Sequence, residues 1–183
     1  NLRVTPRVDW GFIRRLRFAP VESQFDLNKN NELLNADISI RPFGFSTLHG
    51  DRVDFYFNRS YDWVESPYTI FNNIIDSGKY WFNFYSLSMS TTPGRTVYGG
   101  LQFNTGDFYN GKRNYFYTTA TWPVTIHLTL NADYRYNKIR LPSGSFVTNE
   151  FGGSVRYDFS TMLYTSLFAQ WNNELNELNL NYR

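Results

Sequence analysis

The chain offers little with which to build a hydrolytic or metal centre. It has two histidines, His49 and His127, and no cysteine. A serine hydrolase or a zinc site needs a histidine that converges with a nucleophile, a carboxylate or further ligands, and no spacing here suggests such a group. We interpret His49, which precedes Gly50, as a turn residue and His127 as a residue on the polar side of a strand. We therefore expect no metal, no cofactor and no catalytic role.

Acidic side chains are more numerous than histidines in this chain. Three of them, Asp133, Glu150 and Asp158, lie on the same strand faces as Arg135 and Arg156 if the segments around them are strands. A glycosidase needs two carboxyl groups that face each other across its substrate. Opposite charges on neighbouring strands instead form pairs that stabilise a polar sheet face. We favour charge pairing over catalysis for these residues.

Aromatic residues make up 20% of the chain. Rings gathered in one loop can stack on a sugar, whereas Trp and Tyr near strand ends form the girdles of membrane proteins at headgroup depth. The girdle interpretation is favoured because the rings recur near expected turns. The residues assigned to the girdle are Trp10, Trp63, Tyr80, Trp81, Trp122 and Trp171. The loop residues that are better candidates for contact with a ligand or partner are Tyr68, Phe71, Phe108 and Tyr109.

The elements that must position these residues are strands with two unlike faces. From Val124 to Tyr136 every second residue is apolar or aromatic, and the residues between them are polar or charged. Alternate residues of a strand point to opposite faces. Segments 34–41, 53–63 and 147–159 repeat the pattern, with Arg59 interrupting the apolar face of the second, and segments 80–91 and 112–122 alternate less cleanly. The first segment is long enough for the roughly 9–11 residues of a transmembrane strand.

Turn-forming residues divide the chain into about ten or eleven strand segments within one domain, residues 1–183. Tight turns are predicted at 92–94, 122–123 and 158–160. Longer connections, which we place outside the cell, are predicted at 28–31, 64–78, 110–112, 138–145 and 172–176, with one helical turn at 71–75. Segments 2–8 and 177–183 resemble incomplete strands, so we expect this sheet to be part of a larger barrel.

Composition is consistent with a sheet that has lipid on one side and water on the other. The mean hydropathy of −0.47 is polar despite the aromatic content, and no apolar run approaches the about 18 residues of a transmembrane helix. The net charge of +2 gives no reason to expect nucleic acid. The fold class expected is an antiparallel up-and-down transmembrane β-barrel. The residues expected to line its lumen are Asp37, Arg41, Asp54, His127, Asp133, Arg135, Glu150, Arg156 and Asp158.

Several loop motifs occur in an order and spacing typical of one protein family. They are SLSMS at 86–90, GDFYNGKR at 106–113, LPSGSF at 141–146, VRYDFS at 155–160 and NELNELNLN at 173–181. Over residues 12–183 the chain resembles the barrel region of bacterial proteins of domain of unknown function 5916, found in Bacteroidota and their relatives. The resemblance implies further strands after Arg183 and a carbohydrate-binding family 9-like domain before Asn1. It implies no catalytic residue.

The function expected is that of a barrel in the bacterial outer membrane that acts as a pore, a transport element or an anchor in an envelope assembly. Its expected partners are membrane lipids and lipopolysaccharide, with a saccharide or other envelope proteins as further possibilities, and no nucleic acid. One alternative is a saccharide-binding or saccharide-processing protein whose barrel anchors the upstream domain. Another is a secreted all-β module, which long two-faced strands with an aromatic exterior disfavour.

Overall fold

The computed structural model describes residues 2–174 and 176–183, and these residues form strands and no helix. No helix long and apolar enough to cross a membrane occurs among them. The strands are β1 (Arg7–Trp10), β2 (Ile13–Leu16), β3 (Ala19–Leu27), β4 (Leu33–Thr47), β5 (Arg52–Val64), β6 (Tyr68–Ile70), β7 (Asn73–Ile75), β8 (Gly78–Ser90), β9 (Tyr98–Phe108), β10 (Gly111–Pro123), β11 (Leu128–Leu141), β12 (Gly144–Asp158), β13 (Tyr164–Asn172) and β14 (Glu177–Tyr182).

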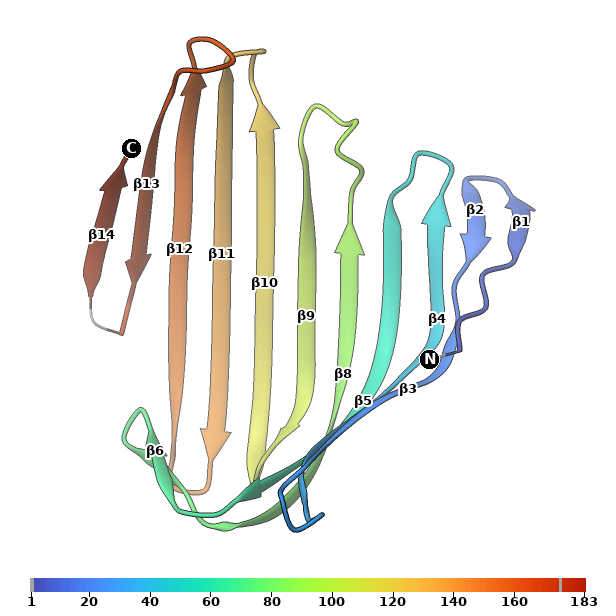
Figure 1. Ribbon diagram of the computed structural model, residues 1–183, viewed down its shortest axis with the longest axis vertical. Helices are drawn as coiled ribbons and strands as arrows, with labels where there is room; N and C mark the ends of the chain where they lie inside the picture. The colour runs from blue at the N-terminus through green and yellow to red at the C-terminus, as the bar shows by residue number, and fades with distance from the viewer. Residues whose placement is uncertain (1, 175) are drawn as a thin grey trace.

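Within the described residues, twelve strands form one antiparallel sheet in the order β1-β2-β4-β5-β8-β9-β10-β11-β12-β13-β14, with β3 also paired to β4. The strands follow one another up and down, and Figure 1 shows them as a single open layer with β1 and β14 at opposite edges. The prediction of an all-β, antiparallel up-and-down sheet is confirmed. The described residues contain no pairing that closes the sheet into a barrel.

The sheet has more strands than the ten or eleven expected because its N-terminal region is broken into short pieces. β2 pairs with the end of β4, from Phe45 to Thr47, whereas β3 pairs with the beginning of the same strand, from Leu33 to Arg41. One long neighbour of β4 is thus divided in two, and β1 adds a further short strand beside β2.

Cross-strand register keeps each set of alternate residues on one side of the sheet. A row of directly paired residues across β9 to β13 defines what we call the apolar face: Leu101, Thr118, Tyr134, Phe151 and Trp171. The next row, on the opposite side, defines the polar face: Gln102, Tyr117, Arg135, Glu150 and Asn172. The alternation in the sequence therefore predicted the two faces correctly.

The predicted strand from Val124 is wrong at its start. The β10 strand runs on to Pro123, and residues 124–127 form a turn in which the amide of Val124 donates to the carbonyl of Leu128. The hydroxyl of Thr125 accepts hydrogen bonds from the amides of His127 and Leu128. These local bonds end the ladder, as Thr side chains often do in turns. From Leu128 onward the strand has the predicted faces.

The sequence predicted correctly which connections lie at the same end of the sheet, but it did not predict their lengths correctly. All five predicted long connections lie at one end of the sheet, yet β9 and β10 are joined by 109–110 alone and β11 and β12 by 142–143 alone. Connections at the other end, which we call the distal end, comprise 48–51, 91–97, 124–127 and 159–163. Glycine and proline mark turns without fixing how far the flanking strands extend. The connection at 172–176 includes Leu175, which is outside the described residues.

The remaining long connection, between β5 and β8, forms a hairpin of β6 and β7 rather than the predicted helical turn. Phe71 and Asn72 have φ values of 47° and 62°, which matches the positive φ required at both central residues of a type I′ turn. We call the end of the sheet where it lies the hairpin end. In Figure 1 the hairpin extends beneath the neighbouring strands to the turn between β11 and β12.

The apolar core of the chain lies beneath this hairpin, on the polar face. Ile75 of β7 is fully buried, and Val64, Ile139 and Leu141 pack against it from β5 and β11. Side chains around this cluster include Ile70, Tyr80, Phe108, Tyr109 and Phe146. The hairpin is therefore packed against the end of the sheet and does not project away from it.

Candidate functional site

The polar face carries ion pairs between neighbouring strands, as the sequence predicted. Arg135 of β11 stands directly opposite Glu150 of β12, and its guanidinium lies 2.6 Å from the carboxylate. The same guanidinium lies 5.1 Å from the ring centre of Tyr117 on β10. The guanidinium of Arg135 is therefore placed between a carboxylate and an aromatic ring on the polar face.

A second pair lies within one strand. Arg156 and Asp158 are two residues apart on β12, so both point to the polar face, and their side chains approach to 2.8 Å. The guanidinium also lies 4.2 Å from the ring centre of Tyr164, which is paired with Asp158 on β13. These two residues therefore form an ion pair within one strand, whereas the sequence led us to expect pairs between neighbouring strands.

The most enclosed charges gather around Asp54. Its carboxylate lies 3.2 Å from Arg17 and 3.5 Å from Arg41, and Arg41 is only 5% exposed. Arg41 has the same parity on β4 as Asp37 and Ser39, so ordinary alternation places it on the polar face, and the register shifts only after it, before Phe43. It also donates a hydrogen bond to the hydroxyl of Tyr56. Two arginines around one carboxylate leave a net positive charge here, and Arg17 was not foreseen from the sequence.

A close approach of the backbone makes room for this cluster. Gly44 is paired with Asp54, and a β-carbon at Gly44 would lie 2.3 Å from a carboxylate oxygen of Asp54. Farther along the same two strands, the hydroxyl of Ser60 donates to Asp37 over 2.6 Å. Asp37 and Asp54 therefore both face the polar side, as predicted.

Asp133 and His127 depart from the prediction. Asp133 is on the polar face but forms no ion pair among the described residues, because it is paired with Gly152 and Thr119, which carry no charge. Its carboxylate occupies the space above Gly152, where a β-carbon would come within 2.2 Å. His127 lies in the turn before β11, its Nδ1 donates to the carbonyl of Asp158 over 2.8 Å, and its ring faces that of Tyr157. It is not on the polar face of a strand.

The four loop residues proposed as partner contacts lie together at the hairpin. Tyr68 and Tyr109 meet edge to face with ring centres 6.2 Å apart, and Phe108 meets Tyr109 at 4.8 Å. Phe71, at the hairpin tip, packs against Phe146 of β12 at 4.5 Å. These rings fasten the hairpin to the sheet, although Tyr68 and Phe71 keep part of their surface exposed.

Two polar contacts complete the attachment of the hairpin. The hydroxyl of Tyr109 donates to Asp62 of β5 over 2.6 Å. Burial and this neighbouring carboxylate raise the pKa of Tyr109 above its usual value, so the phenol remains a neutral donor. The hydroxyl of Ser143, in the turn between β11 and β12, donates to the side-chain oxygen of Asn73 over 3.3 Å. The hairpin thereby links β5 to β11 and β12 across the sheet.

Five of the six residues assigned to a girdle lie on the apolar face, near the ends of strands. They are Trp10 and Trp122 near the distal end and Trp63, Trp81 and Trp171 near the hairpin end. Tyr80 is the exception. It is paired with Asp62 on the polar face and packs against Tyr109 beneath the hairpin.

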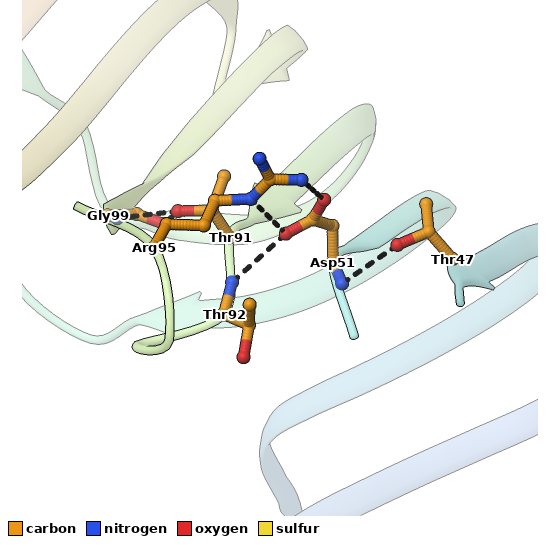
Figure 2. Close-up of polar contacts among 6 residues, drawn as sticks. All are labelled: Thr47, Asp51, Thr91, Thr92, Arg95 and Gly99. Carbon is orange, nitrogen blue, oxygen red and sulfur yellow. Dashed lines mark hydrogen bonds and ion pairs between the residues drawn. The ribbon is translucent and has the colours of Figure 1, made fainter. Parts of the chain in front are cut away.

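A polar network at the distal end was not predicted from the sequence (Figure 2). Arg95 binds the Asp51 carboxylate through two nitrogens, with Nε 3.0 Å from Oδ1, and the amide of Thr92 donates to the same carboxylate. The amide of Asp51 in turn donates to Thr47. The bonds from Arg95 and Thr92 lower the pKa of Asp51 to about 2. This network joins the β4–β5 turn to the β8–β9 connection, 44 residues away for Arg95.

The described residues contain no group of three His, Asp or Glu side chains that could hold a metal ion. Comparison with protein-family models and with curated proteins gives no match to this chain. The site is therefore interpreted from its own geometry: a charged, hydrogen-bonded face that is partly covered at one end by an attached hairpin.

Proposed function

We propose that this chain forms part of the wall of an outer-membrane β-barrel, with its apolar face toward lipid and its polar face toward the lumen. The observation that supports this most strongly is the exposure of large apolar side chains on the apolar face. Phe151 is 49% and Val155 46% exposed, and both belong to a row of such residues. A water-soluble sheet buries side chains of this kind against other elements.

The exposed apolar surface continues across the sheet. Large hydrophobic residues on this face are exposed on β5, β8, β9, β10, β12, β13 and β14, among them Phe55, Met89, Phe103, Trp122, Val155, Leu167 and Leu180. The largest apolar patch on a typical soluble monomer is only about 300–600 Å². A lipid environment removes the cost of exposing such a surface to water.

The height of the apolar surface fits a bilayer. On β11 it runs from Leu128 to Tyr136, eight residue steps of about 3.4 Å, or roughly 27 Å along the strand. A tilt of about 40° reduces this to roughly 21 Å, close to the apolar band of about 25 Å around known barrels. The tryptophans near both ends of the face fit interfacial positions.

A sheet in a membrane requires strand partners at both of its edges. Backbone groups at β1 and β14 that have no strand partner would be unsatisfied in hydrocarbon, at a cost of several kcal/mol for each group. We propose that further strands, from the same polypeptide or another chain, pair with both edges. The resemblance to barrels of domain of unknown function 5916 is consistent with this and stays a prediction.

The hairpin would narrow the lumen at its outer end in such a barrel. It crosses from β5 and β8 to the β11–β12 turn and is fixed there by the packing of Ile75 and Phe71. We propose that the barrel serves as a pore or transport element with this fixed constriction, beside which the charges of the polar face select among solutes.

Cell fractionation tests membrane residence. The complete protein should sediment with outer membranes, resist extraction by high salt and require detergent to remain dispersed. A monodisperse species recovered in detergent-free buffer would refute the proposal.

A further inference from the structure

Three cations interrupt the apolar side of the sheet at the hairpin end. Lys112 of β10 is paired directly with Arg140 of β11, and Lys138 lies two residues before Arg140 on the same strand. All three occupy the side of the sheet opposite Ile139, which is buried beneath the hairpin. They therefore belong to the apolar face and not to the polar face, which carries the ion pairs around Asp54, Arg135 and Arg156.

The positive charge of this group is not balanced. Lys112 forms an ion pair with Asp107 of β9. The side chains of Lys138 and Arg140 make no hydrogen bond, ion pair or ring contact with any described residue. Three cations and one carboxylate give a local charge of two positive units at the edge of an apolar surface.

The surroundings of the cations form a shallow depression. It has a volume of about 390 Å³, and Tyr85, Thr105 and Asn114 line it together with the three cations. One step toward the centre of the apolar face, Phe116 is paired with Tyr136. The cations therefore border rings at the depth where aromatic side chains meet lipid headgroups in membrane proteins.

The spacing of the cations suits a phosphate group. Paired residues on neighbouring antiparallel strands have Cα atoms about 4.5–5.5 Å apart, and residues two apart on a strand about 6.8 Å. Long basic side chains from such positions can converge on one phosphate or on two adjacent ones, and Arg can bind phosphate through two nitrogens. The side-chain oxygen of Asn114 accepts a hydrogen bond from the hydroxyl of Thr105 over 2.7 Å, which leaves the amide nitrogen of Asn114 as a neutral donor.

We propose that Lys112, Lys138 and Arg140 bind the phosphate of an anionic lipid headgroup on the outward side of the sheet. This inference rests on the proposed membrane location of the apolar face. A lipid is favoured over a free phosphate ion because Tyr85, which lines the depression, is half exposed on the apolar face, where acyl chains would lie. A free ion would gain nothing from that surface.

Lipid retention by the complete protein tests the proposal. The protein is purified in a neutral detergent, mixed with micelles that contain either phosphatidylglycerol or phosphatidylcholine, and examined for bound lipid by native mass spectrometry. The wild type should retain phosphatidylglycerol preferentially. The double variant K138Q/R140Q should lose roughly fivefold of this preference for each cation removed.

A charge-matched control separates a site from a general effect of charge. Lys29 and Arg52 are exposed, make no ion pair among the described residues and lie away from the depression. The variant K29Q/R52Q should retain the wild-type preference, and K138R should restore most of the preference lost in K138Q. Lys29, Arg52 and Arg140 are exposed, and the half-buried side chain of Lys138 has no polar partner among the described residues, so heat-dependent gel mobility should show folded protein for each variant.

Several outcomes would overturn the inference. One is an equal preference in the wild type and K138Q/R140Q, and another is an equal loss in K29Q/R52Q. Inorganic phosphate that abolishes lipid retention at millimolar levels would identify a free-ion site instead. If the protein sediments with membranes yet shows no lipid preference, this inference fails alone. If it disperses without detergent, the proposed function has failed as well.

Discussion

Replacing Ala132 by arginine tests the assignment of the apolar face at its centre. Ala132 lies four residues from both Leu128 and Tyr136, the limits of the apolar run on β11. Its paired neighbours are Ala120 and Gly153, and an apolar depression of about 500 Å³ surrounds it. A longer side chain therefore fits here without steric conflict, and the effect of Ala132→Arg comes from its charge.

The expected cost depends on what the face contacts. An arginine on the lipid face at the bilayer midplane costs roughly 2–4 kcal/mol, whereas an exposed surface substitution in water usually costs at most about 0.5 kcal/mol. Ala132→Leu should be nearly neutral, because it adds apolar surface in the same place. Asn131→Arg, one residue away on the polar face, loses exposed hydrogen bonds to Thr121 and Ser154 and should cost less than about 1.5 kcal/mol.

The assay is reversible unfolding of the complete protein in urea in the presence of phosphatidylcholine vesicles, followed by tryptophan fluorescence. The free energy of unfolding should fall in the order wild type and Ala132→Leu, then Asn131→Arg, then Ala132→Arg. Equal losses for the two arginine variants, or a greater loss for Asn131→Arg, would show that the faces are assigned wrongly.

Three further predictions concern polar contacts. Arg95 lowers the pKa of Asp51 to about 2, so the contribution of this ion pair to stability is complete above about pH 4 and is lost as the pH falls through 2. Asp51→Asn should remove this dependence on acid, and amide exchange at the distal turns measures it. Tyr109→Phe removes the hydrogen bond to Asp62 and should destabilise the hairpin by about 1.5–3 kcal/mol, which would appear as faster amide exchange in β6 and β7. Unchanged exchange would show that this bond does not hold the hairpin against the sheet. Glu150→Gln should change stability by less than about 1 kcal/mol, because the ion pair with Arg135 is partly exposed. The same variant should shift ion selectivity toward anions in planar bilayers, because it removes a negative charge. An unchanged reversal potential would place Glu150 outside the lumen.

The absence of catalysis also stays a prediction. The amide variants of Asp133, Glu150 and Asp158 should alter stability or ion selectivity and remove no enzymatic rate. A hydrolytic activity of the barrel that one of these substitutions abolished would contradict it.

The faces of the sheet could be predicted because side-chain direction in a strand depends only on parity. Tyr134 and Phe151 each alternate with polar-face residues such as Arg135 and Glu150, which places both rings on the apolar face, and the turn between the strands then decides that they pair directly. Strand ends were less predictable. His127 fits the alternation of β11 in the sequence. In the structure, however, the amides of His127 and Leu128 donate to the hydroxyl of Thr125, and the resulting turn leaves His127 outside the strand, which begins at the next residue.

Contacts between distant segments could not be read from the sequence at all. Arg17 pairs with Asp54 and Arg95 pairs with Asp51 because strand pairing brings these residues close together. The residues on either side of each arginine in the sequence do not indicate which carboxylate it will bind. The hairpin tip presented a similar difficulty. Phe71 looked like an exposed loop residue, but its ring lies against Phe146, 75 positions farther along the chain.

The central claim, that the apolar face contacts lipid, is tested most directly by nitroxide scanning of β11. The chain has no cysteine, so single cysteines can be introduced one at a time from Thr129 to Tyr134 and labelled without background. In reconstituted vesicles, labels at 130, 132 and 134 should collide often with oxygen and rarely with a water-soluble nickel complex, and labels at 129, 131 and 133 should show the reverse. High accessibility to the nickel complex at every position would contradict the claim.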